Sequence, residues 1–136
     1  MIILGIIHRD IKPANILIAN SVPKFADFGF AVCKHVNTNN MGNYNVGTPL
    51  YMAPESLLHN TYSYKSDIWA LGVVLFEMLY SKTPFYSPTE SLLKEKLKEY
   101  QKHNQIPLPN NKLVSQDILR IIAGMLAYDS SKRWTL

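Results

Sequence analysis

The residues best suited to chemistry lie close together near the start of the chain, in the segment His8-Arg9-Asp10-Ile11-Lys12-Pro13-Ala14-Asn15. Asp10 supplies a carboxylate, Lys12 a cation and Asn15 an amide oxygen, and a second carboxylate follows at Asp27. Phosphoryl transfer needs such groups, because a carboxylate must sit beside the attacking hydroxyl and a cation must offset the charge on the moving group. Magnesium prefers hard oxygen ligands. Asp10 and Lys12 are therefore candidate catalytic residues for such chemistry, and Asn15 and Asp27 are candidate metal ligands.

A short hairpin is predicted between these groups. The runs Ile16-Leu17-Ile18 and Pro23-Lys24-Phe25 are typical of two short strands, and Ala19-Asn20-Ser21 joins them. A hairpin at this place would bring Asn15 and Asp27 back to the same end of the strand pair. The spacing is therefore consistent with both residues serving one site.

The rest of the chain is predicted to form helices around a buried one. Residues 66–80 are apolar nearly all round, and such a helix belongs in the middle of a domain. The run Ser87-Pro88-Thr89-Glu90 has the form of a capping box and predicts an amphipathic helix over residues 88–103. Ser115 is the expected cap of a further helix that continues through residue 126.

Three further motifs and one arginine follow the first segment in order. They are Asp27-Phe28-Gly29, Ala53-Pro54-Glu55, Asp67-Ile68-Trp69-Ala70-Leu71-Gly72 and Arg133. Alone, each is typical of an ordinary turn, a helix start or a surface residue. Their joint order and spacing resemble the second half of a eukaryotic protein kinase domain, from the catalytic loop onward.

The resemblance implies an α+β fold that is mainly α: a fragment of the kinase C-lobe with a short β-hairpin and a central buried helix. Residues 1–136 would form a partial kinase domain, in which residues 27–55 are the activation segment. The resemblance also implies ATP and Mg2+ as cofactors, bound by Lys12, Asn15 and Asp27, and a protein as the substrate.

Two residues resemble the serine/threonine class of these enzymes. The pattern His-Arg-Asp-x-Lys-x-x-Asn, which includes Lys12, is similar to serine/threonine kinases, and in that class a threonine at the position of Thr48 contacts Asp10 and Lys12. Phe30 resembles the choice of enzymes that prefer serine over threonine as acceptor, although it could also serve packing alone. The runs at residues 27–31 and 47–55 show a weak similarity to autophagy-initiating kinases.

The resemblance also implies regulation through the activation segment. The arginine before the catalytic aspartate often binds a phosphate on this segment, which assigns that role to Arg9. Thr38 and Tyr44 are the candidate phosphorylation sites, and an upstream activating kinase is therefore a possible partner. Tyr44 departs from the family pattern, because many relatives have a serine or threonine three residues before Gly47.

Structural roles are implied for five residues, which are His8, Phe28, Glu55, Asp67 and Arg133. Asp67 is expected to accept hydrogen bonds from the backbone N–H groups of the His8-Arg9 turn, and a helix cap is a role that could coexist with this one. Glu55 and Arg133 are expected to form a buried bidentate ion pair. The alternative for Arg133 is a solvated loop residue, as its polar neighbours suggest.

Composition disfavours several other functions. The chain has 136 residues, a hydrophobic fraction of 47% and a formal net charge of +4, which allow one packed core. Lysines and glutamates alternate over residues 94–99 and are typical of a solvated helix face, not of a nucleic-acid-binding patch. The single cysteine, Cys33, cannot form an intrachain disulfide, which favours a cytoplasmic location. No apolar run is long enough to span a membrane.

Nucleotide binding in this family also uses a Gly-rich loop, a strand lysine and a helix glutamate. The chain has 6 glycines but no G-x-G-x-x-G pattern, and no candidate for the strand lysine precedes His8. We therefore expect a truncated gene product, a fragmentary gene model or a piece of a longer protein. Two functions stay open: a serine/threonine kinase, or an inert C-lobe that docks substrates or other kinases. The reading frame upstream of Met1 would distinguish them.

Overall fold

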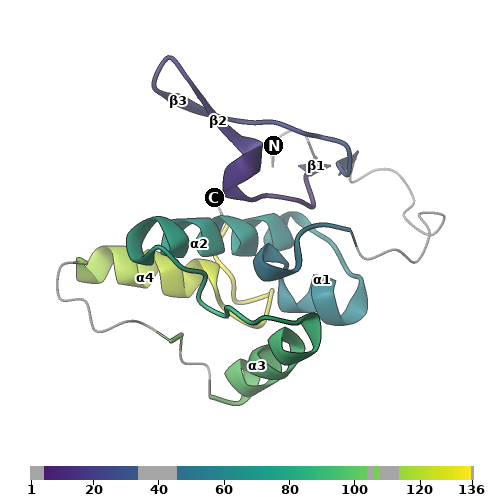
Figure 1. The fold of residues 1–136 in the computed structure, drawn as a ribbon, viewed down its shortest axis with the longest axis vertical. Coiled ribbons are helices and arrows are strands. Elements are labelled where there is room, and N and C mark those ends of the chain that lie inside the picture. Colours follow the sequence, from purple (N-terminus) through teal and green to yellow (C-terminus); the bar gives the residue numbers. More distant parts are fainter. Residues whose placement is uncertain (1–4, 34–45, 104–105, 108–113, 136) are drawn as a thin grey trace.

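The computed structural model describes residues 5–33, 46–103, 106–107 and 114–135. The expected α+β fold, mainly α, is confirmed: the helices lie together, and the strands lie on the other side of α2 from α3 (Figure 1). In chain order the elements are β1 (Ile6–Ile7), the 3-10 helix η2 (Pro13–Asn15), β2 (Ile16–Ala19), β3 (Val22–Phe25), β4 (Val32–Cys33), the 3-10 helix η4 (Pro49–Tyr51), α1 (Pro54–His59), α2 (Tyr64–Tyr80), α3 (Glu90–His103) and α4 (Gln116–Met125).

The predicted hairpin is present as β2 and β3, which pair antiparallel. Its turn consists of Asn20 and Ser21, with φ angles of 52° and 60°. Positive φ at both central residues is the geometry that matches the twist of a two-residue hairpin. Ala19, which was expected in the connection, instead pairs with Val22 as the last residue of β2.

A second antiparallel pair, which the sequence did not predict, joins β1 to β4. Ile6 pairs with Cys33 and Ile7 pairs with Val32. This pairing places the residues that lead into His8 beside those that follow Gly29. The two segments that carry the first and second motifs are therefore held together by backbone hydrogen bonds.

The central helix α2 begins two residues before the predicted start because Ser63 caps it. The Ser63 hydroxyl accepts from Lys65 N–H, and Ser63 N–H donates to the Ser66 hydroxyl at 3.1 Å. This cap leaves the carboxylate of Asp67 available for contacts outside the helix. Sequence reasoning had considered Asp67 itself as the cap, and the structure assigns that role to Ser63.

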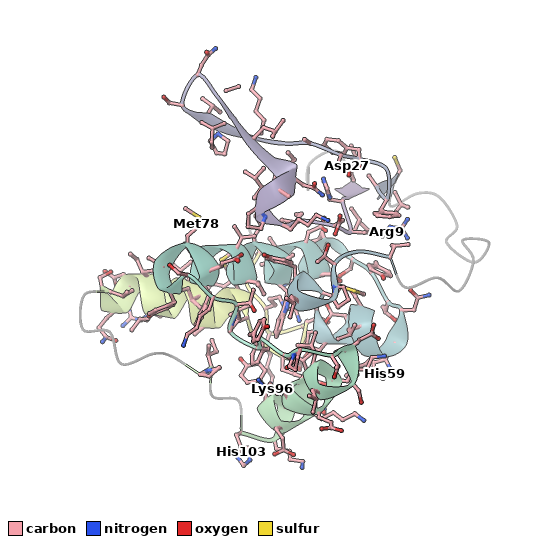
Figure 2. All side chains as sticks on the ribbon, in the orientation of Figure 1. Arg9, Asp27, His59, Met78, Lys96 and His103 are labelled. Atoms are coloured by element: carbon pink, nitrogen blue, oxygen red, sulfur yellow. The ribbon has the colours of Figure 1, made fainter. Side chains whose placement is uncertain are left out.

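The expectation that α2 is buried on all sides is wrong for its last turns. Met78 is 76% exposed and points away from the other helices (Figure 2). Leu71, Leu75 and Leu79 are only partly buried. The apolar pattern reports which side chains can be buried, whereas actual burial depends on which segments pack against each side.

The main core lies between α2, α3 and α4. Trp69 of α2 stacks on Phe85 with ring centroids 5.7 Å apart, and Tyr100 of α3 contacts both rings. Ile122 and the residue after α4, Leu126, are fully buried in the same cluster. Burial of these large side chains supplies the main stabilising term of the fold.

The α2–α4 contact requires a glycine at position 72. A Cβ at Gly72 would lie 2.9 Å from Met125 Cβ and 3.0 Å from Leu126 Cδ2. We expect Gly72→Ala to lower the free energy of unfolding by about 1–2 kcal/mol, because overpacking costs roughly 1–3 kcal/mol and outweighs the gain in helix propensity of about 1 kcal/mol. Chemical denaturation measures the change. Ser91→Ala, at an exposed site of α3, is the control, and equal midpoints for both variants would contradict the expectation.

The start of α3 differs from its prediction. The helix begins at Glu90, and Thr89 caps it, because its hydroxyl accepts from Leu92 N–H at 3.4 Å. Ser87 instead donates to the carbonyl oxygen of Phe85. The predicted capping box is therefore wrong, since the hydroxyl of Ser87 turns back to its own loop.

The charged face of α3 and the cap of α4 agree with expectation. Lys94 and Glu90 form an ion pair at 2.7 Å. Ser115 accepts from Ile118 N–H at 3.4 Å and begins α4 as predicted. Among the described residues, none of the helices has the length and apolar character needed to cross a membrane.

Candidate active site

The loop that carries Asp10 is suspended from the first turn of α2. Asp67 accepts from His8 N–H at 2.8 Å and from Arg9 N–H at 3.1 Å, as expected. Arg9 has a φ of 69°, a left-handed conformation that is costly for a residue other than glycine and that the surroundings must hold. Burial raises the pKa of Asp67, while the two N–H donors oppose that rise.

His8 connects this loop to the segment that precedes Asp27. Its side chain is fully buried, and Nε2 lies 3.0 Å from the carbonyl oxygen of Ala26. A carbonyl can only accept, so Nε2 carries the proton and Nδ1 is left to accept from Asp10 N–H at 3.4 Å. The ring also contacts Phe28, with centroids 5.0 Å apart.

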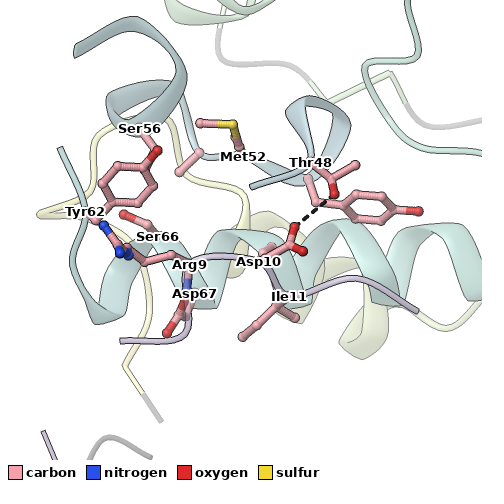
Figure 3. Close-up of a pocket in the computed structure, with 12 residues that line it drawn as sticks. Arg9, Asp10, Ile11, Thr48, Met52, Ser56, Tyr62, Ser66 and Asp67 are labelled. Atoms are coloured by element: carbon pink, nitrogen blue, oxygen red, sulfur yellow. Dashed lines mark hydrogen bonds between the residues drawn. The ribbon is translucent and has the colours of Figure 1, made fainter. Parts of the chain in front are cut away.

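Asp10 stands at the centre of a cluster of hydrogen bonds, and Figure 3 shows the one from Thr48. The Thr48 hydroxyl donates to Asp10 Oδ1 at 2.9 Å. Lys12 Nζ donates to the same hydroxyl at 2.9 Å and lies 2.8 Å from Asp10 Oδ2. These distances show the contacts expected between Thr48, Asp10 and Lys12.

The same contacts set the charge of Asp10. Burial of the carboxyl group would raise its pKa, but the hydrogen bonds from Lys12 and Thr48 and the charge of Lys12 together hold the pKa below its usual value. Asp10 is therefore a carboxylate at neutral pH. An ionised group with a fixed orientation can accept a hydrogen bond from an incoming hydroxyl.

Asn15 is joined to this cluster, and its amide oxygen is left for another ligand. Its Nδ2 donates to the Asp10 carbonyl oxygen at 2.9 Å and to Asp10 Oδ2 at 3.2 Å. Oδ1 has no donor among the described residues. An amide oxygen oriented in this way is a suitable ligand for Mg2+.

Asp27 reaches the same end of the hairpin through the backbone. Ala26 N–H donates to the Asn15 carbonyl oxygen at 2.9 Å, so the residues on either side of the hairpin stay together, as predicted. The Asp27 carboxylate is exposed and accepts from Gly29 N–H at 3.2 Å through Oδ1.

The oxygens of Asn15 and Asp27 suit Mg2+, which is usually bound by one or two protein groups and by substrate phosphates. Among the described residues there is no cluster of three or more His, Cys, Asp or Glu that could hold a metal ion by itself. The chemistry of the Asn15 and Asp27 oxygens is thus compatible with Mg2+.

A small cavity adjoins Asp10 on the side of α2. It is lined by Arg9, Thr48, Tyr62 and Asp67 among others (Figure 3) and has a volume of about 20 Å³. This space holds about one water molecule. A larger groove of about 690 Å³ runs along α3, and none of the candidate site residues that the structure describes lines it.

Arg9 does not point into solvent alone. Its Nε donates to the Phe30 carbonyl oxygen at 2.5 Å, and its guanidinium lies 5.4 Å from the centroid of the Tyr62 ring. Phe30 is 42% exposed, so its side chain is not buried in the core. Thr38 and Tyr44, the candidate phosphorylation sites, lie outside the described residues.

The ion pair between Glu55 and Arg133 is present and bidentate, as expected. Arg133 Nη1 lies 2.7 Å from Glu55 Oε1, and Nη2 lies 3.1 Å from Oε2. Arg133 is only 2% exposed, so the alternative of a solvated loop residue is wrong. The pair ties the first turn of α1 to the end of the chain.

Sequence reasoning missed two tyrosines near the site. Tyr51 donates to Glu77 Oε2 at 2.7 Å, and the Tyr62 hydroxyl bonds to the backbone of Val46. A carboxylate within the apolar run that follows Asp67 on α2 was a signal that could have drawn attention to Glu77. Tyr62 belongs to no motif, and its partner is 16 positions away, so only the structure reveals it.

Comparison with known proteins agrees with this geometry. The family model described as protein kinase domain matches residues 3–136. This chain belongs to the protein kinase family. The curated proteins that it resembles are named serine/threonine-protein kinases. The chain is accordingly part of a kinase domain of the serine/threonine type.

The relatives are considerably longer than the region they share with this kinase chain. Serine/threonine-protein kinase ULK3 of Homo sapiens is 37% identical over 132 residues, which cover 95% of the chain and 27% of ULK3. Serine/threonine-protein kinase ATG1 of Kluyveromyces marxianus is 31% identical over 151 residues, with 95% and 18% covered. For atg1 of Dictyostelium discoideum the identity is 35% over 132 residues, with 94% and 19% covered.

Proposed function

We propose that these residues form the phosphate-transfer side of a serine/threonine kinase active site, which moves the γ-phosphoryl group of ATP to a protein hydroxyl. The hydrogen-bonded cluster of Asp10, Lys12 and Thr48 is the observation that carries the proposal. It supplies an ionised carboxylate and a cation held 2.8 Å apart, each with a fixed orientation. Positioning and charge neutralisation are what this reaction asks of a protein.

Each group has one role in the proposed reaction. Asp10 accepts a hydrogen bond from the acceptor hydroxyl and takes its proton as the oxygen attacks the γ-phosphorus. The bond from that phosphorus to the bridging oxygen of ADP breaks, and ADP leaves with its negative charge. Lys12 offsets charge on the transferred group. Asn15 and Asp27 would hold the magnesium ion, which supplies charge neutralisation on the phosphates when it is bound.

The activation segment, residues 27–55, would connect this chemistry to regulation. Arg9 is the proposed ligand of a phosphate on this segment, with Thr38 and Tyr44 as candidate acceptors for an upstream kinase. The Arg9 guanidinium already bonds to the Phe30 carbonyl oxygen inside the segment. A phosphate on the segment would add a charge-assisted hydrogen bond to Arg9, whose guanidinium already contacts the segment at Phe30.

An inert docking module is the second candidate. It applies to the 136 residues by themselves, which contain no G-x-G-x-x-G loop, the element that covers the phosphates in active members of the family. The two candidates predict different behaviour once such a loop is supplied. Retained chemistry in the Asp10 cluster would support the enzyme.

We expect the 136 residues alone to bind magnesium–ATP more weakly than micromolar, because they contact the nucleotide from one side only. A chimera in which the nucleotide-binding half of a family member precedes these residues should bind at micromolar affinity or tighter and transfer phosphoryl to a protein. Calorimetric titration and a transfer assay with labelled ATP provide the measurements.

Asp27→Ala in the chimera should abolish productive magnesium–ATP binding, since it removes a proposed metal ligand. Asp117→Ala is the matched control, because Asp117 has an exposed side chain on α4. Micromolar or tighter binding by the 136 residues alone would contradict the expectation that they contact the nucleotide from one side only. A folded chimera that binds magnesium–ATP without transfer would favour the docking module.

A further inference from the structure

The Tyr62 hydroxyl makes two hydrogen bonds to a single residue of the activation segment. Val46 N–H donates to it at 2.9 Å, and the hydroxyl donates to the Val46 carbonyl oxygen at 2.8 Å. In extended backbone the N–H and C=O of one residue point to the same side. The hydroxyl thus takes the place of a neighbouring strand and fixes both peptide groups of Val46.

The Tyr62 ring is itself held against the catalytic loop. The Arg9 guanidinium lies 5.4 Å from the ring centroid, and the backbone of Arg9 is bonded to Asp67 at the start of α2. Burial raises the pKa of Tyr62, while the bond from Val46 and the charge of Arg9 oppose that rise. The hydroxyl therefore keeps its proton at neutral pH and can donate to the Val46 carbonyl.

The two residues after Val46 leave little freedom between this contact and the site. Gly47 has a φ of 110°, and a Cβ there would lie 2.6 Å from the Arg9 carbonyl oxygen. The backbone of Gly47 thus passes directly against the catalytic loop. Thr48 follows, and its hydroxyl bridges Asp10 and Lys12. A displacement at Val46 would be passed on to Thr48.

We propose that Tyr62 is a positioning residue of the kinase site. Its hydroxyl bonds to both backbone groups of Val46 and thereby places Thr48 between Asp10 and Lys12. The expected effect on kcat rests on the proposed function, whereas the expected effect on the position of Thr48 rests on the contacts alone. If Tyr62 only stabilised the fold, removing its hydroxyl would leave the position of Thr48 unchanged.

Tyr62→Phe tests the inference, because it removes only the hydroxyl and keeps the ring beneath Arg9. Tyr100→Phe is the matched control. Tyr100 is a buried tyrosine whose hydroxyl, like that of the partly buried Tyr62, donates to a backbone carbonyl, that of Leu126 at 2.7 Å, and it lies in the core cluster with α3. Both variants lose a hydroxyl bonded to a backbone carbonyl, and only the hydroxyl of Tyr62 bonds to the activation segment.

In the 136-residue chain, amide exchange followed by NMR should accelerate about tenfold at Val46 in Tyr62→Phe, since a net hydrogen bond is lost. The 13Cβ signal of Thr48 should also shift. In Tyr100→Phe both observables should match the unaltered chain, after comparison at equal fractions of folded protein. An unchanged Thr48 signal in Tyr62→Phe overturns the inference.

In the chimera described above, Tyr62→Phe should lower kcat roughly 10- to 100-fold, because a small misplacement of positioning groups is costly. KM for ATP should change less than kcat, since among the described residues Thr48 contacts only Lys12 of the three proposed cofactor-binding residues. A kcat equal to that of Tyr100→Phe overturns the positioning role. If the unaltered chimera folds and transfers no phosphoryl, the proposed function fails, and the Thr48 signal alone decides the inference.

Discussion

Replacing Arg133 with leucine is expected to lower the free energy of unfolding by roughly 3–5 kcal/mol, the range seen when one partner of a buried ion pair is removed. The Arg133 side chain has no exposed surface, whereas that of Glu55 is 19% exposed. After the substitution the Glu55 carboxylate keeps, among the described residues, only the bond from the Ser66 hydroxyl at 3.1 Å. A largely buried charge would then lack its counter-ion.

The Arg133 guanidinium also donates hydrogen bonds to three backbone carbonyls, which raises the cost of its removal. Nε donates to Ala127, Nη1 to Lys65 and Nη2 to Tyr128, at 2.7–3.2 Å. The Cζ atom of Arg133 lies 5.1 Å from the centroid of the Trp69 ring. Leucine can fill part of the space but can satisfy none of these acceptors.

Denaturant unfolding followed by circular dichroism measures this effect. Arg120→Leu is the matched control, because Arg120 lies on the exposed side of α4 and is 3.8 Å from the exposed Asp117. A surface pair of this kind contributes about 0–1 kcal/mol. Equal midpoints for the two leucine variants would refute the structural role of Arg133.

A double variant separates the stranded charge from lost packing. Glu55→Leu combined with Arg133→Leu removes both charges, and replacing a whole buried pair is often far less costly than breaking it. We therefore expect the double variant to be more stable than Arg133→Leu alone. A double variant no more stable than Arg133→Leu would show that the lost contacts of the guanidinium, and not the stranded charge, account for the cost.

The second large effect concerns Asp10. In the chimera that supplies a nucleotide-binding half, Asp10→Asn is expected to lower kcat roughly 10²- to 10⁴-fold, the range that a positioned general base contributes. Three donors converge on this carboxylate, from Lys12, Asn15 and Thr48. Asparagine offers one acceptor oxygen and would direct an NH2 group at another donor, so it disrupts the cluster as well as removing the base.

The assay should separate turnover from binding. KM for ATP is expected to change less than kcat, because Asp10 contacts the proposed cofactor-binding residues Lys12 and Asn15 but is not itself a proposed metal ligand. Asp129→Asn is the control, since Asp129 is exposed and contacts Ser131 in a loop far along the chain. Near-normal kcat in Asp10→Asn would overturn the role of Asp10, whatever the control shows.

Much of the candidate site is predictable from sequence because its members are close along the chain. Asp10, Lys12 and Asn15 fall within one loop, so their spacing alone brings them near one another. The hairpin and the Ser115 cap were predicted for the same reason, since both depend on hydrogen bonds between nearby residues. The partners Glu55 and Arg133 are 78 positions apart, and only the resemblance to a family suggested that pair.

Tertiary structure decided the features whose partners are remote. The Ser87 hydroxyl could cap a helix or bond within its own loop, and packing of Phe85 in the core selected the loop. Met78 has the same apolar character as the buried residues of α2, yet no described segment covers it. Local pattern reports what a residue can do, and the partner that the fold brings to it decides what it does.

The hydrogen bonds between the Tyr62 hydroxyl and the Val46 backbone show most clearly the difference between local and tertiary determinants. Nothing in the residues around Tyr62 predicts a hydrogen bond to Val46, because the loop and α1 between them must first fold back. The sequence determined the chemical groups and the short spacings of the Asp10 loop. The relative placement of Thr48, Arg9 and Tyr62 comes from the packing of α1 and α2 beneath them, since contacts between distant segments form only after those segments have been brought together.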